Sequence, residues 1–273
     1  MLLRLAIPIL AACIAIPMTA QRITITTNPS TPGPAAETRT LTAQTMTIQP
    51  STPKRATETR TFALENGGGL KISSHNGAIR VLAWDKDEVA LTAKFKSSSR
   101  GKHVHIDVQS DKDYLELIVE VPSGRDNRGI IGPSCEMELN VPRHIAADIE
   151  TINSNILLDS INGKINVETI NGEIVLKDVS GDINLSALNG AISGTIQNVK
   201  DRLDIDAHNG KINVKLLNLD GTLEASSFRG KIKIPSNPKF IESVDGNVTA
   251  KYGDGSAVMN FKNFNGSIIV QRF

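Results

Sequence analysis

A nine-residue pattern of apolar and polar positions fills the second half of the chain. The second and fourth residues after each repeat glycine are mostly apolar, as in Ile165 and Val167, and so is the residue two places before it, as in Ile161. The pattern predicts regularly spaced short strands. Its glycines lie at Gly163, Gly172, Gly181 and Gly190 and then, less regularly, at Gly210, Gly221, Gly230, Gly246 and Gly266.

The pattern distinguishes two all-β arrangements. An Asn-Gly pair between apolar runs is a strong hairpin signal, which would give an antiparallel meander. However, the apolar position after one glycine and the apolar position before the next are three residues apart, as at Val167 and Ile170. An odd step places two side chains on opposite faces of a straight strand, so the chain must bend once per repeat to bury both. Regular bends at glycine favour a β-solenoid with a turn of roughly twenty residues.

Half-buried strands are predicted ahead of the repeats as well. Apolar and polar residues alternate over 88–95, 104–109, 115–121 and 137–141, as in antiparallel strands with one face buried. Two further short strands flank His75-Asn76-Gly77, a turn signal. We therefore expect an all-β fold, a short-period β-solenoid or β-helix preceded by a few antiparallel strands.

The chain divides into four predicted segments. Residues 1–20 have the charged start, apolar middle and short end of a secretory leader. An alternative for the same residues is a lipobox that ends at Cys13, which would carry a lipid. Residues 21–58 are rich in Thr and Pro and are predicted to be a disordered stalk. Residues 59–146 form an N-terminal strand region and 147–273 the solenoid, together one continuous domain 59–273.

Composition narrows the expected partners and the location. The chain has 30 Lys and Arg against 29 Asp and Glu, so no basic excess favours nucleic acid. Contact with a membrane is expected only if Cys13 is lipidated or the leader is retained. Aromatic residues make up 4%, which argues against a sugar cleft lined by rings. The leader predicts export to the cell envelope, as a periplasmic or surface protein, or secretion.

The entry strands and repeats carry a family resemblance. The matching residues are Leu70–Trp84 with Asn76-Gly77, then Met137–Arg143, Asp148–Ile152 and the run of Asn-Gly-x-Ile-x-Val units. Over about Arg60 to Phe273 the chain resembles bacterial adhesin-like β-strand-repeat domains of unknown function, including the auto-transporter adhesin head domain. The resemblance implies an envelope-attached or secreted β-solenoid and supplies no catalytic residues.

Candidate chemistry is sparse along the chain. His103 and His105 share a strand face, but no third metal ligand is spaced with them. Asp204 and Asp206 also share a face, as a glycosidase pair would need, although a solvated outer face explains them as well. Cys135 is predicted to be a buried small residue without a disulfide partner. We expect no catalytic, cofactor or metal site, and the singled-out residues are the repeat glycines, including Gly77.

Two further features stay open on sequence grounds. Asn162, Asn171, Asn189 and Asn209 either stack as amide ladders or occupy a left-handed backbone conformation. The insert Pro122–Ser134, with Arg125 and Arg128, is either a plain connection or a loop that meets an acidic partner.

Three functions are compatible with these features. The first is an adhesin-like binding module with an unknown surface ligand. The alternative is a periplasmic or envelope scaffold or sensor, which contacts a partner protein through an uncapped end strand. The third, disfavoured, is a carbohydrate-active enzyme on a β-helix. We expect the chain not to be an enzyme.

Overall fold

The computed structural model describes residues 44–49, 55–96, 104–120 and 133–272, all in one compact unit, Ala43–Phe273. The predicted leader with Cys13, most of the predicted stalk, His103, and Arg125 with Arg128 lie outside these residues. Every regular element in the described ranges is a β-strand, which confirms the all-β prediction. A search of the same ranges finds no helix that is long and apolar enough to span a membrane.

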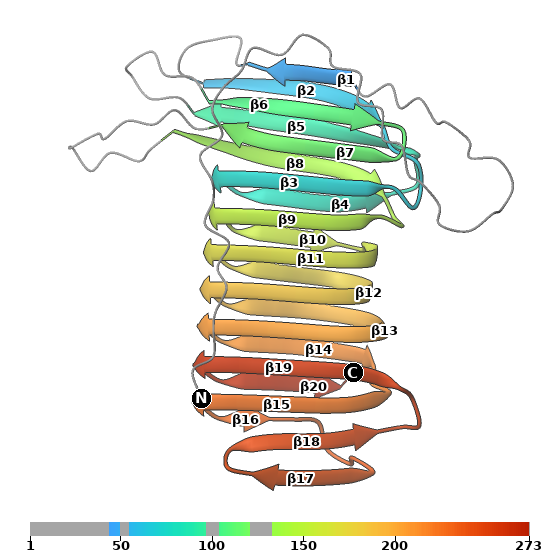
Figure 1. Ribbon diagram of the computed structural model, residues 1–273, viewed down its shortest axis with the longest axis vertical. Helices are drawn as coiled ribbons and strands as arrows, with labels where there is room; N and C mark the ends of the chain where they lie inside the picture. Colours follow the sequence, from blue (N-terminus) through green and yellow to red (C-terminus); the bar gives the residue numbers. More distant parts are fainter. Residues whose placement is uncertain (1–43, 50–54, 97–103, 121–132, 273) are drawn as a thin grey trace, which may run out of the picture. The chain divides into compact units, whose positions relative to one another are not determined.

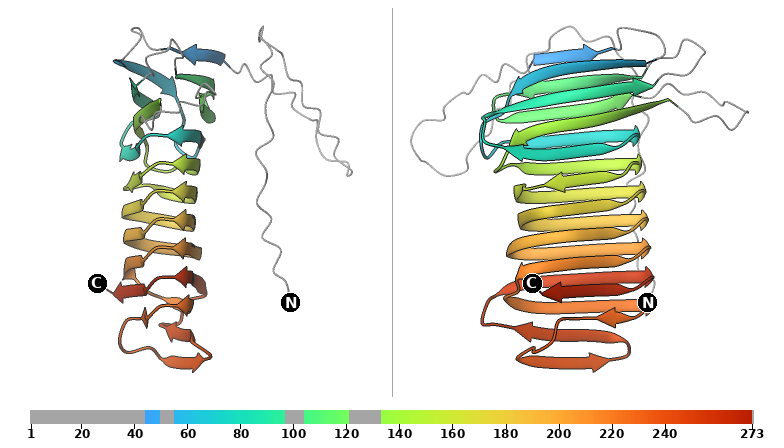
Figure 2. Two further views of the ribbon diagram at one scale, coloured as in Figure 1. Left: turned by 90° about the vertical axis from the view of Figure 1, so that its left-hand side faces the viewer. Right: turned by 180° about the vertical axis from the view of Figure 1, so that it is seen from behind.

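The strands form two facing walls, which we call wall A and wall B (Figures 1 and 2). Wall A contains, in spatial order, β1 (Gln44–Ile48), β6 (His105–Asp111), β7 (Tyr114–Glu120), β3 (Gly69–Asn76), β9 (Ala146–Asn153), β11 (Asn162–Asn171), the second halves of β12 (Ile174–Asn189) and β13 (Ile192–Asn209), β19 (Ala257–Asn265), β15 (Gly221–Arg229), β18 (Asn247–Tyr252) and β17 (Phe240–Val244). Wall B contains β2 (Arg55–Ala63), β5 (Glu88–Lys96), β8 (Ser134–Pro142), β4 (Ile79–Trp84), β10 (Ile156–Asp159), the first halves of β12 and β13, β14 (Ile212–Asn218), β20 (Ile268–Arg272) and β16 (Ile232–Lys233).

Successive coils stack in register through parallel pairing, which confirms the predicted solenoid. Ile156 pairs with Ile174, and Ile174 pairs with Ile192. Equivalent residues of neighbouring coils are 18 residues apart at Asn153 and Asn171 and 20 apart at Asn189 and Asn209. The inward side chains of both walls meet in one core, and its aliphatic columns, such as Val167 above Leu185, exclude water along the whole stack.

The repeat glycines lie at corners where two coils almost touch. A Cβ added at nine of them would fall within 2.1 Å of a backbone oxygen of the next coil, which no side chain can do. The tenth, Gly246, has φ +79 and open space around it, so its backbone conformation rather than crowding selects glycine. The nine crowded positions are Gly77, Gly163, Gly172, Gly181, Gly190, Gly210, Gly221, Gly230 and Gly266.

Two features of the N-terminal region differ from the sequence prediction. The two strands around Asn76-Gly77, which the sequence placed ahead of the solenoid, do not pair with each other, because β3 pairs with β7 and β9 while β4 pairs with β8 and β10. They are a complete solenoid coil, and Gly77 is a corner like those of the later coils. The expected antiparallel pairs are found in β5 with β8 and in β6 with β7.

The predicted stalk 21–58 also contains strands. β1 pairs with β6, and β2 pairs with β5 from Arg55 onward. Their many Thr residues have good strand propensity, and the apolar Ile48 and Phe62 are buried against the core. Composition alone predicted disorder because apolar residues such as Ile48 are few in 21–58, and Phe62 lies beyond that segment.

The chain bends at different points in the two corners of a coil. This corrects the prediction that the apolar residue two places before each repeat glycine is buried. At one corner the chain turns at Ser160 and Asp178, which have positive φ, and Ile161 and Val179 then point inward. At the other corner, which contains Asn171-Gly172, the strand runs straight to the Asn, so alternation continues and Ile170 faces outward. Leu188, Phe228 and Phe264 are exposed at the same kind of corner, and Val244 is exposed on the end hairpin.

Candidate binding surface

A ladder of asparagine amides follows one edge of wall A. In each step the Nδ2 of one Asn donates to the Oδ1 of its neighbour, over 2.8–3.0 Å. None of these Asn residues has a positive φ, so stacking rather than a left-handed backbone accounts for the predicted Asn171, Asn189 and Asn209. Asn162 is outside the ladder. The six members are Asn76, Asn153, Asn171, Asn189, Asn209 and Asn265.

An outward column of mainly apolar side chains runs beside this ladder, and we call it the apolar column. Ile170 and Leu188 in its middle are 43% and 40% exposed, and Phe228 at its end is 68% exposed. The rings of its lower part stack face to face, with centroids 4.7 Å apart for His208 and Phe264 and 4.9 Å apart for Phe264 and Phe228. Its members are His75, Ile152, Ile170, Leu188, His208, Phe264 and Phe228.

Most of the other side chains on the outer face of wall A are polar. The Nδ2 of Asn184 donates to Asn166 and that of Asn166 to Asp148, each over 2.7 Å. Glu168 follows Asn166 on the same face. Reduced hydration, and then the negative charges of Glu150 and Asp148 on the neighbouring coil, raise the pKa of Glu168. The outer face of wall A therefore has an apolar edge beside a partly acidic region whose side chains are hydrogen-bonded to each other.

This arrangement suits contact with a broad surface. The ring of Phe264 is stacked on both faces, by His208 and by Phe228, so its edge rather than its faces is offered to a ligand. Arg229 lies over Phe228, with its Cζ 5.7 Å from the ring centroid. A sugar ring binds aromatic side chains mainly through their faces, whereas a protein surface can pack on a flat stripe of ring edges and aliphatic groups.

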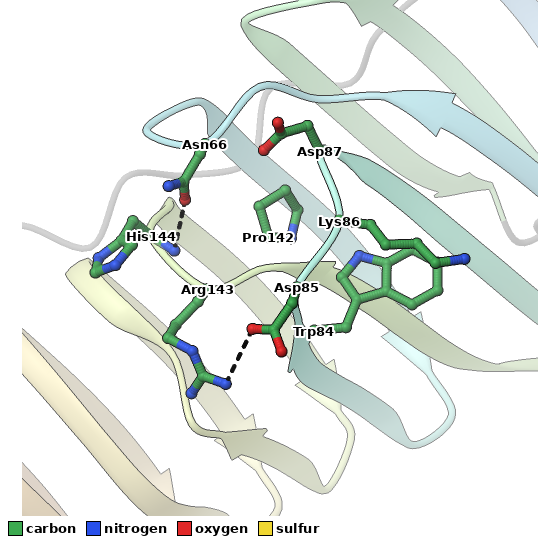
Figure 3. Close-up of a pocket in the computed structure, with 8 residues that line it drawn as sticks. All are labelled: Asn66, Trp84, Asp85, Lys86, Asp87, Pro142, Arg143 and His144. Atoms are coloured by element: carbon green, nitrogen blue, oxygen red, sulfur yellow. Dashed lines mark hydrogen bonds and ion pairs between the residues drawn. The ribbon is translucent and has the colours of Figure 1, made fainter.

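A shallow depression of about 280 Å³ lies at the N-terminal end of the stack (Figure 3). Several of its polar groups already have partners. The Asp85 carboxylate faces the Arg143 guanidinium at 3.5 Å, and the Trp84 Nε1–H donates to the backbone oxygen of Glu88 over 2.8 Å. The backbone N–H of His144 donates to Asn66 Oδ1. These contacts tie the 85–87 turn to the end of β8, and they do not converge on a reacting atom.

The other residues singled out from the sequence have structural partners or lie apart. His105 Nε2 is 3.7 Å from Asp107, and no group of three metal-ligand side chains occurs in the described ranges. Asp204 accepts hydrogen bonds from Arg202 and Asn260, which lower its pKa against the opposing effect of burial. Cys135 is buried and free, and burial raises its pKa to about 12.

Sequence reasoning missed the apolar column because it assigned Ile170 and its equivalents to the core. In the structure burial alternates from Val167 to Ile170, which keeps Ile170 on the outer face, but the spacing around Gly172 in the sequence is the same as around Gly163 and gave no signal of this.

The chain matches the model of one known protein family. The family model of Toastrack DUF4097 matches residues 68–271. The chain belongs to the Toastrack DUF4097 family. This confirms the resemblance to repeat domains of unknown function that the sequence indicated. The matched residues run from the first solenoid coil, β3–β4, to the coil that comes last in the sequence, β19–β20.

Several solved structures resemble this Toastrack chain at low identity. A proposed cell adhesion protein from Clostridium sporogenes has 16% identity and a TM-score of 0.45, over 80% of this chain and all (100%) of the other. A proposed adhesin from Bacteroides fragilis has 10% identity and a TM-score of 0.38, over 81% and 99%. A proposed lipid-binding protein from Parabacteroides distasonis has 12% and 0.29, over 80% and 96%. No curated protein matches the chain.

Proposed function

We propose that this Toastrack chain is a non-enzymatic recognition module of the bacterial cell envelope that binds a protein partner on the outer face of wall A. The observation that carries the proposal is the apolar column, in which exposed aliphatic and aromatic side chains stay in register over successive coils. A rigid stack holds such a stripe without the entropy cost of ordering a loop on binding. Large exposed apolar side chains in one line are typical of interaction surfaces.

A role without catalysis is supported by how the acidic groups are used. Asp204 is held by Arg202 and Asn260, and Asp148 accepts a hydrogen bond from Asn166. A carbohydrate-active enzyme on the same fold would need two carboxylates that converge on one bond, and it would lose turnover when one was neutralised. Asp206→Asn should leave binding of a protein partner largely intact, since Asp206 lies outside the apolar column.

The binding face can be tested with a matched pair of double variants. Ile170→Ser with Leu188→Ser removes the middle of the apolar column, and Leu217→Ser with Val258→Ser removes two side chains of similar exposure from outside it. Immobilised fibronectin and collagen are the protein probes, and peptidoglycan and chitin are the sugar probes. We expect retention on a protein probe to fall at least about tenfold for the column variant only. Equal loss in both variants, or retention only on sugars, would contradict the proposal.

The location is tested by protease treatment of intact cells that express a tagged chain, followed by fractionation. Digestion from outside would place the module on the surface, as an adhesin requires, and would direct the binding assay to host and matrix proteins. Protection until the outer barrier is opened would place it inside the envelope.

Protection would favour the second candidate function, an internal scaffold or sensor that contacts a partner edge-on. The end strand β17 supports this candidate, because in the described ranges it pairs only with β18. Its Phe240, Ile241 and Val244 are exposed, so an added strand would gain both backbone hydrogen bonds and apolar contact.

A further inference from the structure

The order of the coils in space departs from their order in the chain at one place. β19 lies between β13 and β15, and β20 lies between β14 and β16 (Figure 1). Residues 257–272, which we call the inserted coil, are therefore flanked by coils that precede them in the sequence. The chain first skips one coil position between β14 and β15, builds the end of the stack, and then returns to fill the slot it left.

The inserted coil makes the same kinds of contact with its neighbours as the other coils do: core packing, the amide ladder and the close glycine contact. Phe261 and Ile268 are buried in the common core. Asn265 donates to Asn209 over 2.8 Å and extends the amide ladder. Gly266 lies on Gly210, with its position for a Cβ 1.9 Å from the Gly210 oxygen, so the coil enters at the same close spacing as the others.

This coil also bridges two parts of the stack. In the described ranges β15 pairs with β18 and β19, and β16 pairs with β20. Strands β15 to β18, residues 221–252, form what we call the terminal unit. Strand pairing joins this unit to β13 and β14 only through the inserted coil, among the residues that the structure describes.

An unfilled slot would not close well on itself. Asn260 of β19 is paired with Asp204 of β13 on one side and with Glu224 of β15 on the other. With the coil absent, direct pairing of β13 with β15 would place these two carboxylates opposite each other, which is unfavourable. With the coil present, the Asn260 Nδ2 donates to Asp204 over 2.8 Å. The slot therefore favours being filled by a segment of this sequence.

We propose that the slot is a strand-exchange site, and that the inserted coil of a second copy of this chain can occupy it. The hinge is the connection 253–256 between β18 and β19. It contains Gly253, at φ +61, and Gly255, whose N–H donates to the Asp220 carboxylate over 2.6 Å. A coil from another copy would make the same contacts as the chain's own coil, so exchange loses only association entropy and produces a dimer at low cost. The proposal is independent of the ligand of wall A.

A disulfide trap in the full chain tests the exchange. Asp206 of β13 and Lys262 of β19 are exposed and directly paired, at the spacing a disulfide spans. Asp206→Cys and Lys262→Cys are made in separate, differently tagged chains, in a Cys13→Ser background. Cys135 can remain, because it is buried and its thiol has a pKa raised to about 12. The chain with both substitutions reports the intramolecular bond.

Equal amounts of the two single variants are unfolded in urea together, refolded, oxidised, and separated without reducing agent. Exchange predicts a disulfide-linked heterodimer that increases with protein concentration and exceeds, by at least about fivefold, the amount formed when Lys177→Cys on wall B replaces Lys262→Cys. Adding Asp220→Ala, which releases the hinge, should raise the heterodimer fraction further. The proposal is overturned if the doubly substituted chain forms its internal bond while the mixed single variants give no more heterodimer than the Lys177→Cys control.

Discussion

At the scale of single residues, the distance between coils decides which side chains are allowed. Gly190 has no strained φ in the left-handed region, yet its Cβ position is 1.8 Å from the Gly172 oxygen. Gly190→Ala must push two coils apart, and we expect it to lower the free energy of unfolding by about 2–4 kcal/mol. Gly67→Ala is the control, since Gly67 has φ +95 but open space, and should cost about 1 kcal/mol. Urea unfolding measures both, and equal losses would contradict the crowding argument.

The raised pKa of Glu168 gives a pH-dependent prediction. The Glu168 carboxylate binds a proton more readily in the folded protein than in the unfolded chain, because of reduced hydration and the charges of Glu150 and Asp148. The ionised carboxylate therefore lowers stability above its raised pKa, and this penalty disappears below the unfolded value of about 4.3. Glu168→Gln should stabilise the protein at pH 7 and have little effect at pH 3.5. Urea unfolding at both pH values tests this, and a stabilisation that grows in acid would contradict it.

At the scale of strands, alternation in the sequence predicted most elements, because each strand has one buried face. The predicted strand 88–95 is β5, Glu88–Lys96, and 137–141 lies within β8. The two kinds of corner were not predicted. Both contain glycine, and only the left-handed Ser160 and Asp178 mark the corner that turns the next side chain inward. The spacing of glycine and apolar residues is the same at both kinds of corner, so the sequence pattern did not distinguish them. The candidate site was missed for this reason.

The inward assignment of the repeat is testable within one element, β12. Ile183 is buried in the core, while Lys177 on the same strand is exposed and pairs with Asp159 at 3.9 Å. Ile183→Asp places an unpaired carboxylate in the apolar core, and we expect it to cost more than about 4 kcal/mol and to unfold the coil. Lys177→Asp loses a surface ion pair and should cost about 1 kcal/mol or less. Circular dichroism and thermal unfolding compare them, and equal stability would overturn the assignment.

At the scale of the whole described unit, local patterns determine that coils stack but not in which order. Every coil presents similar aliphatic columns and a similar Gly corner, so the 257–272 sequence would fit several neighbours equally well by pattern alone. Its position between β13 and β15 depends on contacts between residues far apart in the chain, such as Asn260 with Asp204. Such a choice cannot be read from periodicity.

A stack of this kind should open in segments, because each coil contacts mainly its neighbours. Phe261→Ser removes a buried ring from the inserted coil, through which the terminal unit pairs with β13 and β14 in the described ranges. In hydrogen exchange we expect faster exchange in 257–272 and in 221–252, with 146–189 unchanged. Phe95→Ser, an equally buried ring in β5, is the matched control and should instead affect β2 and β8. If either variant increased exchange uniformly, the stack would unfold as one cooperative unit, and the inserted coil would not be a separable element.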